Sequence, residues 1–215
     1  MPSDGVDLTR FQIQVAHVFF ALPASEGFVL AGAAALIAHG LIHRRTQDLD
    51  FFRSTSNVVQ ARDAFEEAAR QRQWAVQRIH DSETFVRLTV HGPDALVVDL
   101  CLDSAPVRPI VVSSIGPTFA PEELAGRKLL ALFDRAEARD FTDAHALLRS
   151  YTQTELLTMA AQIDPGFDPL VLAQMMRTIS RYSDPQLTIA GDDPDGLRRE
   201  FHAWADELER ADKTT

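Results

Sequence analysis

The feature that most constrains this chain is the segment Arg44–Phe52, in which Asp48 and Asp50 alternate with apolar residues. A period of two predicts a strand with one buried face, so Asp48 and Asp50 project to one side while Leu49 and Phe51 enter a core. Two neighbouring carboxylates repel each other unless a positive charge lies between them. Mg²⁺ or Mn²⁺ supplies that charge and binds oxygen ligands, so this strand predicts a metal site.

A third carboxylate is expected from Asp99, which follows the apolar run Leu96–Val98. A carboxylate in a buried strand is costly unless it is paired or binds a metal. Asp99 therefore either completes a metal triad with Asp48 and Asp50 or accepts hydrogen bonds as a structural residue at the end of its strand. The two upstream aspartates favour the triad.

Gly32 lies where an apolar strand over residues 28–31 turns into an alanine-rich helix over residues 33–39. The absence of a side chain lets a phosphate approach the backbone N–H groups at the start of a helix. A glycine in a tight turn that binds nothing is the alternative interpretation.

The composition is that of an ordinary globular chain, with 215 residues, 46% of them hydrophobic and 24% charged. No apolar run approaches the roughly 20 residues of a membrane helix, and no signal peptide is evident, so we expect a cytoplasmic protein with no membrane partner. The single cysteine, Cys101, excludes an internal disulfide. The net charge of −10 argues against duplex binding through a broad basic face, although arginines between Arg44 and Arg87 leave room for a local basic rim.

The pattern along the chain predicts an α+β protein, with a small mixed sheet flanked by helices in residues 1–117 and an α-helical half in residues 118–215. Helices are expected over residues 7–22, 33–39 and 57–72, and strands over 28–31, 48–52, 74–79, 84–90, 95–100 and 109–112. After Gly116-Pro117 the pattern changes to helices alone, expected over 121–133, 137–150, 152–162, 169–180 and 195–210.

Two charged positions in the helical half are candidates for chemistry. Lys128 lies within the apolar helix expected over 121–133, where it either neutralises phosphate charge or extends to the surface as a snorkelling lysine. Asp140 and Asp143 are three residues apart and share a helix face. Arg139 is expected to pair with Asp140, and Asp143 is a candidate general base.

In order and spacing, these motifs resemble the AbiEii/AbiGii-type nucleotidyltransferases, which include MenT-like toxins, within the DNA polymerase β-like superfamily. The family pattern is a Gly-rich helix start, Arg-x-Ser/Thr-x-Asp-x-Asp, a strand-borne Asp, a Lys-Leu-x-Ala-Leu-x-x-Arg helix and Arg-Asp-x-x-Asp. The matching residues are Gly32, Arg44, Thr46, Asp48, Asp50, Asp99, Lys128 to Arg135, Arg139, Asp140 and Asp143.

The resemblance implies transfer of a nucleotide from an NTP to an acceptor with Mg²⁺ or Mn²⁺. In MenT-like toxins the acceptor is the 3′ end of tRNA, and a cognate antitoxin is the expected partner. The implied metal ligands are Asp48, Asp50 and Asp99. The implied phosphate ligand is Lys128, the implied acid or base is Asp143, and the implied nucleotide contacts are Gly32, Arg44 and Thr46.

Two alternatives stay open. An acidic protein attracts cationic substrates, which favours a small molecule or a protein side chain as the acceptor of the same reaction. Ala33 and Ala34 stand where the family often has a hydroxyl group or a second glycine. The second alternative is therefore a domain that binds a nucleotide or a partner without catalysis.

Overall fold

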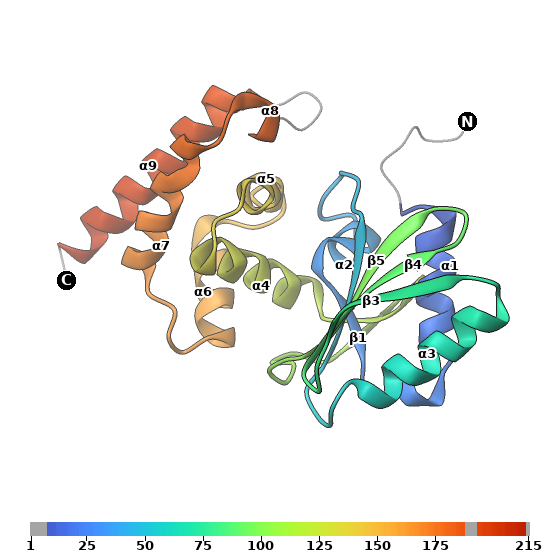
Figure 1. Ribbon diagram of the computed structural model, residues 1–215. Coiled ribbons are helices and arrows are strands. Elements are labelled where there is room, and N and C mark those ends of the chain that lie inside the picture. Colours follow the sequence, from blue (N-terminus) through green and yellow to red (C-terminus); the bar gives the residue numbers. More distant parts are fainter. Residues whose placement is uncertain (1–7, 188–192, 214–215) are drawn as a thin grey trace. The chain divides into compact units, whose positions relative to one another are not determined.

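The structure is a computed structural model that describes residues 8–187 and 193–213. The chain divides into two compact units, Met1–Pro121 and Glu122–Thr215, and each is described by itself. Figure 1 shows the mixed sheet of the first unit and the helices of the second. Residue 7, where the first helix is expected to begin, lies outside the described residues.

The first unit is built on a seven-stranded mixed sheet, which confirms the α+β prediction. Its strand order is β3-β4-β5-β2-β1-β7-β6, with β2 parallel to β5 and antiparallel to β1. The strands are β1 (Val29–Ala31), β2 (Asp48–Arg53), β3 (Ala75–Asp81), β4 (Phe85–His91), β5 (Ala95–Leu102), β6 (Val111–Ser113) and β7 (Gly116–Thr118). The helices are α1 (Arg10–Phe20), η1 (Pro23–Ser25), α2 (Gly32–Ala38) and α3 (Val59–Gln71).

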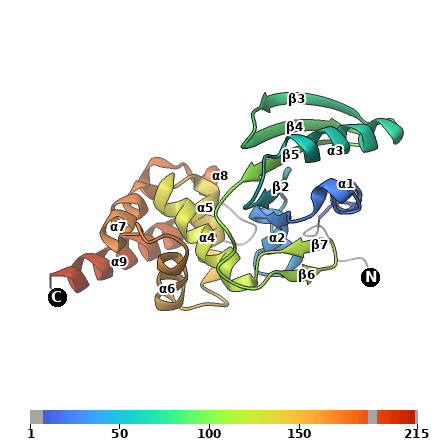
Figure 2. The same cartoon turned by 90° about the horizontal axis from the view of Figure 1, so that it is seen from below.

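Helices α1 and α3 cover one face of this sheet (Figure 2). Phe19 of α1 stacks on Phe51 of β2 at a centroid distance of 4.1 Å and meets the ring of Phe65 of α3 edge-on at 5.9 Å. Leu49 and Phe51 are fully buried beneath the helices. Because side chains alternate along a strand, Asp48 and Asp50 emerge on the opposite face.

The second unit is helical, as predicted. Its helices are α4 (Pro121–Asp134), α5 (Ala138–Leu147), α6 (Gln153–Ile163), α7 (Pro169–Arg177), η2 (Thr178–Arg181), α8 (Asp184–Leu187) and α9 (Pro194–Asp212). Thr152, Asp168 and Asp193 cap α6, α7 and α9, since their side chains accept hydrogen bonds from first-turn N–H groups. Phe141 and Phe201 meet edge-on at 5.1 Å in the core. Within the described ranges, no helix combines the length and the apolar character that crossing a membrane requires.

The strand at Gly116-Pro117 was not among those expected from the sequence. These residues and Thr118 form β7, which pairs antiparallel with β6 and parallel with β1 through Leu30 and Thr118. Glycine and proline usually mark turns, and this three-residue strand exists because of partners that are distant in the sequence.

Candidate functional site

The three aspartates singled out in the sequence lie together on the sheet face opposite α1 and α3. Asp50 of β2 is paired in parallel register with Asp99 of β5, and Asp99 is paired in antiparallel register with Arg87 of β4. Directly paired residues point to the same face, and neighbouring strands are about 4.8 Å apart. Asp48 lies two residues from Asp50 on that face. We call Asp48, Asp50 and Asp99 the carboxylate cluster.

Arg87 holds Asp99 through a two-point ion pair. Nε donates to Oδ1 at 2.9 Å and Nη2 donates to Oδ2 at 2.6 Å. Asp99 is only 4% exposed. The hydrogen bond to Asp99 raises the pKa of Arg87 against an opposing effect of desolvation, and the charges of Asp99, Asp50 and Asp48 raise it further. Asp99 lies inside β5 rather than at its end as expected, because the strand continues to Leu102.

Gly32 makes room for the carboxylate of Asp50. It begins α2 with a φ of +60°, and a Cβ built there would lie 1.8 Å from Oδ2 and 2.9 Å from Cγ of Asp50. No side chain fits at such distances, so the glycine is required by Asp50 as well as by its own backbone conformation. The predicted change from strand to helix at Gly32 is confirmed.

The loop before β2 orients the first carboxylate. The hydroxyl of Thr46 donates to Oδ1 of Asp48, and the buried side chain of Gln12 donates to the carbonyl of Thr46 at 2.8 Å. Arg44 donates to the carbonyl of Arg45 at 3.0 Å. Asp48 is therefore held from the loop and Asp50 is accommodated by the start of α2.

The donor chemistry of the carboxylate cluster fits a hard divalent cation, because all three groups offer carboxylate oxygens. Among the described residues, however, no three His, Cys, Asp or Glu side chains stand in an arrangement that would hold a metal ion. In this arrangement Arg87 donates to both oxygens of Asp99, and Thr46 donates to Asp48. The cluster thus offers suitable ligand atoms, and one of its residues, Asp99, is paired with Arg87 in this structure.

Several arginines of the predicted basic rim form ion pairs with neighbouring carboxylates. Arg62 of α3 contacts Asp63 and Asp81, and Nε of Arg78 lies 2.6 Å from Glu66. The pairs of Arg62 with Asp81 and of Arg78 with Glu66 join α3 to β3 on the helix-covered face of the sheet. They are typical of a solvated helix surface rather than of an anion-binding site.

Lys128 lies in a buried network of charges in the second unit. It is 8% exposed, and its Nζ is 2.9 Å from Oδ2 of Asp143 and 3.3 Å from Oδ1 of Asp140. Both carboxylates are buried. The interpretation of Lys128 as a snorkelling surface lysine is therefore wrong.

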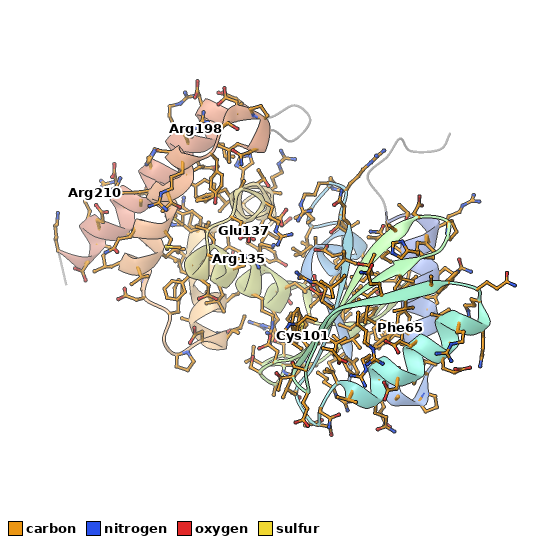
Figure 3. The ribbon with its side chains drawn as sticks, in the orientation of Figure 1. Phe65, Cys101, Arg135, Glu137, Arg198 and Arg210 are labelled. Atoms are coloured by element: carbon orange, nitrogen blue, oxygen red, sulfur yellow. The ribbon has the colours of Figure 1, made fainter. Side chains whose placement is uncertain are left out.

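Arg135 completes this network. Its Nε donates to Asp140 at 3.0 Å, while Arg139 pairs with Glu137 at 2.9 Å, so the expected partner of Asp140 is replaced by Arg135 and Lys128. Figure 3 labels Arg135 and Glu137 beside α4 and α5. Burial on its own raises the pKa of Asp140, but the hydrogen bond from Arg135 and the charge of Lys128 outweigh it and lower the pKa overall.

The structure thus places the predicted site residues in two groups. Gly32, Arg44, Thr46 and the carboxylate cluster belong to the first unit, and Lys128 and Asp143 contact each other in the second. Sequence reasoning missed the pairing of Arg87 with Asp99. A signal was present in the turn residues Gly92-Pro93-Asp94, because counting outward from the flanking pair His91 and Ala95 brings Arg87 opposite Asp99.

Solved structures share this fold of a mixed sheet followed by helices. JHP933 from Helicobacter pylori is 19% identical with a TM-score of 0.57, covering 95% of this chain and 94% of that one. A second H. pylori structure, also 19% identical, has a TM-score of 0.61 and covers 95% and 96%. MenT4, a nucleotidyltransferase toxin from Mycobacterium tuberculosis H37Rv, is 14% identical with a TM-score of 0.55, covering 93% and 84%. No curated protein sequence matches the chain.

The family comparison identifies the class of protein. The profile described as nucleotidyl transferase AbiEii toxin, type IV TA system, matches residues 16–213, which is nearly the whole chain. The chain belongs to this AbiEii family. It is a nucleotidyltransferase toxin of a toxin–antitoxin system, and the resemblance inferred from the motifs is confirmed.

Proposed function

We propose that this toxin transfers a nucleotide from an NTP to the 3′ end of tRNA, with Mg²⁺ or Mn²⁺ bound by the carboxylate cluster. The observation that carries the proposal is the position of Asp48, Asp50 and Asp99 on one sheet face, with Gly32 leaving space for Asp50. Family membership supplies the reaction class. The tRNA acceptor rests on the resemblance to MenT-like toxins.

In the proposed reaction, a hydroxyl oxygen of the tRNA forms a bond to the α-phosphorus of the NTP. The bond from that phosphorus to the oxygen bridging the α- and β-phosphates breaks, and pyrophosphate leaves with the electron pair. A bound divalent cation would stabilise the phosphate charge and favour ionisation of the attacking hydroxyl. Asp48, Asp50 and Asp99 would hold that cation, and the hydroxyl of Thr46 would keep Asp48 in its orientation.

Lys128 and Asp143 carry a separate part of the proposal, in which Lys128 binds phosphate and Asp143 accepts or returns a proton. In the structure their charges compensate each other at 2.9 Å. Removing either one leaves the other buried with less compensation, so a loss of activity in Lys128→Met or Asp143→Asn has to be compared with the loss of folded protein. A role in the reaction is supported only if activity falls further than the folded fraction does.

The test is a transfer assay with each α-³²P-labelled NTP, Mg²⁺ and total tRNA. Wild type is compared with Asp48→Asn and with Asp94→Asn, which makes the same change at an exposed position in the turn between β4 and β5. We expect label in tRNA with wild type and Asp94→Asn, and only background with Asp48→Asn. If Asp48→Asn still transfers the nucleotide, the carboxylate cluster is not required for the reaction.

The acceptor atom is tested with tRNA whose 3′-terminal diol has been oxidised by periodate. Because oxidation removes both hydroxyl groups, label should disappear if the 3′ end is the acceptor. Label that persists places the nucleotide elsewhere. Label that appears only in small molecules or proteins of a lysate supports the alternative acceptors, which the net charge of −10 favours.

The family also implies an antitoxin that opposes this activity, and we propose that one is encoded beside the toxin. Expression of the toxin alone should arrest growth, and co-expression of the neighbouring gene should restore it. Growth arrest by the Asp48→Asn variant as well would show that toxicity does not arise from nucleotide transfer.

A further inference from the structure

We propose that Arg87 is a built-in counter-cation of the carboxylate cluster. Its guanidinium group takes the place of a divalent cation at Asp99 in the metal-free protein and has to release Asp99 before a metal ion binds there. The proposal rests on the metal site of the proposed function and adds a residue that determines the affinity of that site.

The geometry of the ion pair supports direct competition. Arg87 contacts both oxygens of Asp99, at 2.9 and 2.6 Å, in the bidentate geometry by which a guanidinium group binds a carboxylate. Asp99 is almost completely buried, so little of its surface remains for another ligand. A cation that binds Asp99 together with Asp50 therefore competes with the guanidinium group of Arg87 for the same two oxygens.

The charges on this face explain why such a residue is needed. Asp99 and Asp50 occupy directly paired positions of neighbouring strands, with Asp48 nearby on the same face. Like charges in paired positions destabilise a sheet. The positive charge of Arg87 interacts with all three aspartates, so it reduces their repulsion while no metal ion is bound.

Arg87 also has space to withdraw. Its side chain is 48% exposed, whereas that of Asp99 is 6% exposed, so the guanidinium reaches solvent and the carboxylate does not. The Cζ atom of Arg87 lies 5.5 Å from the centroid of the Phe85 ring on the same strand face, a cation–π distance that remains available after release. The exchange needs a side-chain movement and no change in the strands.

The consequence is that removing the charge of Arg87 tightens metal binding. One nearby charge typically shifts a carboxylate pKa by about 1–3 units, and each unit is a factor of ten in proton affinity. A bound metal ion experiences the same competition, so we expect the affinity for Mn²⁺ to rise by about tenfold to a thousandfold on this basis.

The experiment measures Mn²⁺ binding by electron paramagnetic resonance or calorimetry, without nucleotide or tRNA. Arg87→Gln removes the charge beside the cluster. Arg78→Gln is the matched control, because it makes the same change on β3, where Arg78 pairs with Glu66 of α3 on the opposite face of the sheet. Asp48→Asn, which removes a proposed ligand, reports on the metal site itself.

We expect Arg87→Gln to bind Mn²⁺ more tightly than wild type, Arg78→Gln to match wild type, and Asp48→Asn to bind weakly. We also expect Arg87→Gln to melt at a lower temperature than wild type without metal and to recover with Mn²⁺. Equal or weaker binding by Arg87→Gln overturns the proposal while leaving the metal site intact. If Asp48→Asn leaves Mn²⁺ binding unchanged, or if no variant binds Mn²⁺, both the role of Arg87 and the metal site of the proposed function are overturned.

Arg87→Lys keeps the test decisive if Arg87→Gln does not fold, which circular dichroism would show. Lysine retains the charge but loses the two-point contact, so its competition with the metal is weaker than that of arginine. We expect Mn²⁺ affinity modestly above that of wild type. An affinity below wild type would overturn the proposal.

Discussion

Replacing Gly32 with alanine should damage both stability and activity through one displaced carboxylate. The new methyl group would lie 1.8 Å from Oδ2 and 2.9 Å from Cγ of Asp50, so the carboxylate of Asp50 has to move. The residue would also have to keep a φ of +60°, which alanine rarely adopts. The substitution therefore combines a backbone cost with a steric cost at a proposed metal ligand.

The two costs can be estimated separately. A left-handed conformation costs a residue with a Cβ about 1–2 kcal/mol, and forcing an extra methyl group into a packed site costs about 1–3 kcal/mol. Gly32→Ala should thus lower the free energy of unfolding by about 2–5 kcal/mol. Because a 1 Å misplacement at a reacting centre can cost about a hundredfold in rate, we expect a loss of transfer activity of that order.

Gly40→Ala separates these contributions. Gly40 has a φ of +68°, and a Cβ built there would meet no atom within 4 Å. It should therefore show only the backbone cost of about 1–2 kcal/mol and keep its activity. The comparison uses urea unfolding for stability and the tRNA transfer assay for rate.

A double-mutant cycle identifies Asp50 as the source of the steric cost. In an Asp50→Ala background the carboxylate is gone, and the Cβ of residue 50 lies 3.3 Å from the new methyl group of residue 32. Gly32→Ala should then cost little more than Gly40→Ala, giving a coupling of about 1–3 kcal/mol between positions 32 and 50. The reasoning is refuted if Gly32→Ala is no more destabilising than Gly40→Ala, or if it retains full activity.

Three further predictions concern the helical unit. Lys128→Met should lower the free energy of unfolding by about 3–5 kcal/mol in urea titrations, because buried Asp143 loses the ammonium group that lies 2.9 Å from its Oδ2. A loss below about 1 kcal/mol would contradict this. Since the pKa of Asp140 is lowered on folding, its contribution to stability is full above about pH 4 and is lost as the pH falls further. The free energy of unfolding, measured between pH 6 and 3, should fall in wild type and fall less in Asp140→Asn. An equal dependence on pH in the two proteins would contradict this prediction. Gly126→Ala should lower the melting temperature, because the new Cβ would lie 2.9 Å from backbone and side-chain atoms of Met159 on α6. This steric cost opposes the higher helix propensity of alanine. A rise in melting temperature would show that α4 and α6 can move apart enough to accept the methyl group.

The parts of the fold that depend on local pattern were predictable from the sequence. The alternation of Asp48, Leu49, Asp50 and Phe51 predicts the strand and both of its faces, and the structure confirms it. The short strand Gly116–Thr118 was not predictable in this way, because its residues favour turns and its strand partners lie elsewhere in the chain.

Charge partners were harder to predict, for a geometric reason. Arg139 and Asp140 are adjacent in sequence, but adjacent side chains on a helix point in different directions. Asp140 instead binds Arg135 and Lys128 from the preceding helix and loop. Similarly, the partner of Asp99 follows from the register of the β4–β5 hairpin and not from the residues beside it.

The parallel pairing of β2 with β5 also determines when the carboxylate cluster can assemble during synthesis of the chain. Asp50 and Asp99 meet only through a contact between distant parts of the chain, with α3, β3 and β4 between them. A growing chain on the ribosome has no complete carboxylate cluster until β5 has left the exit tunnel and inserted beside β2, and long-range pairings of this kind form slowly. If the cluster binds the catalytic metal as proposed, each newly made molecule stays inactive until these two strands have paired.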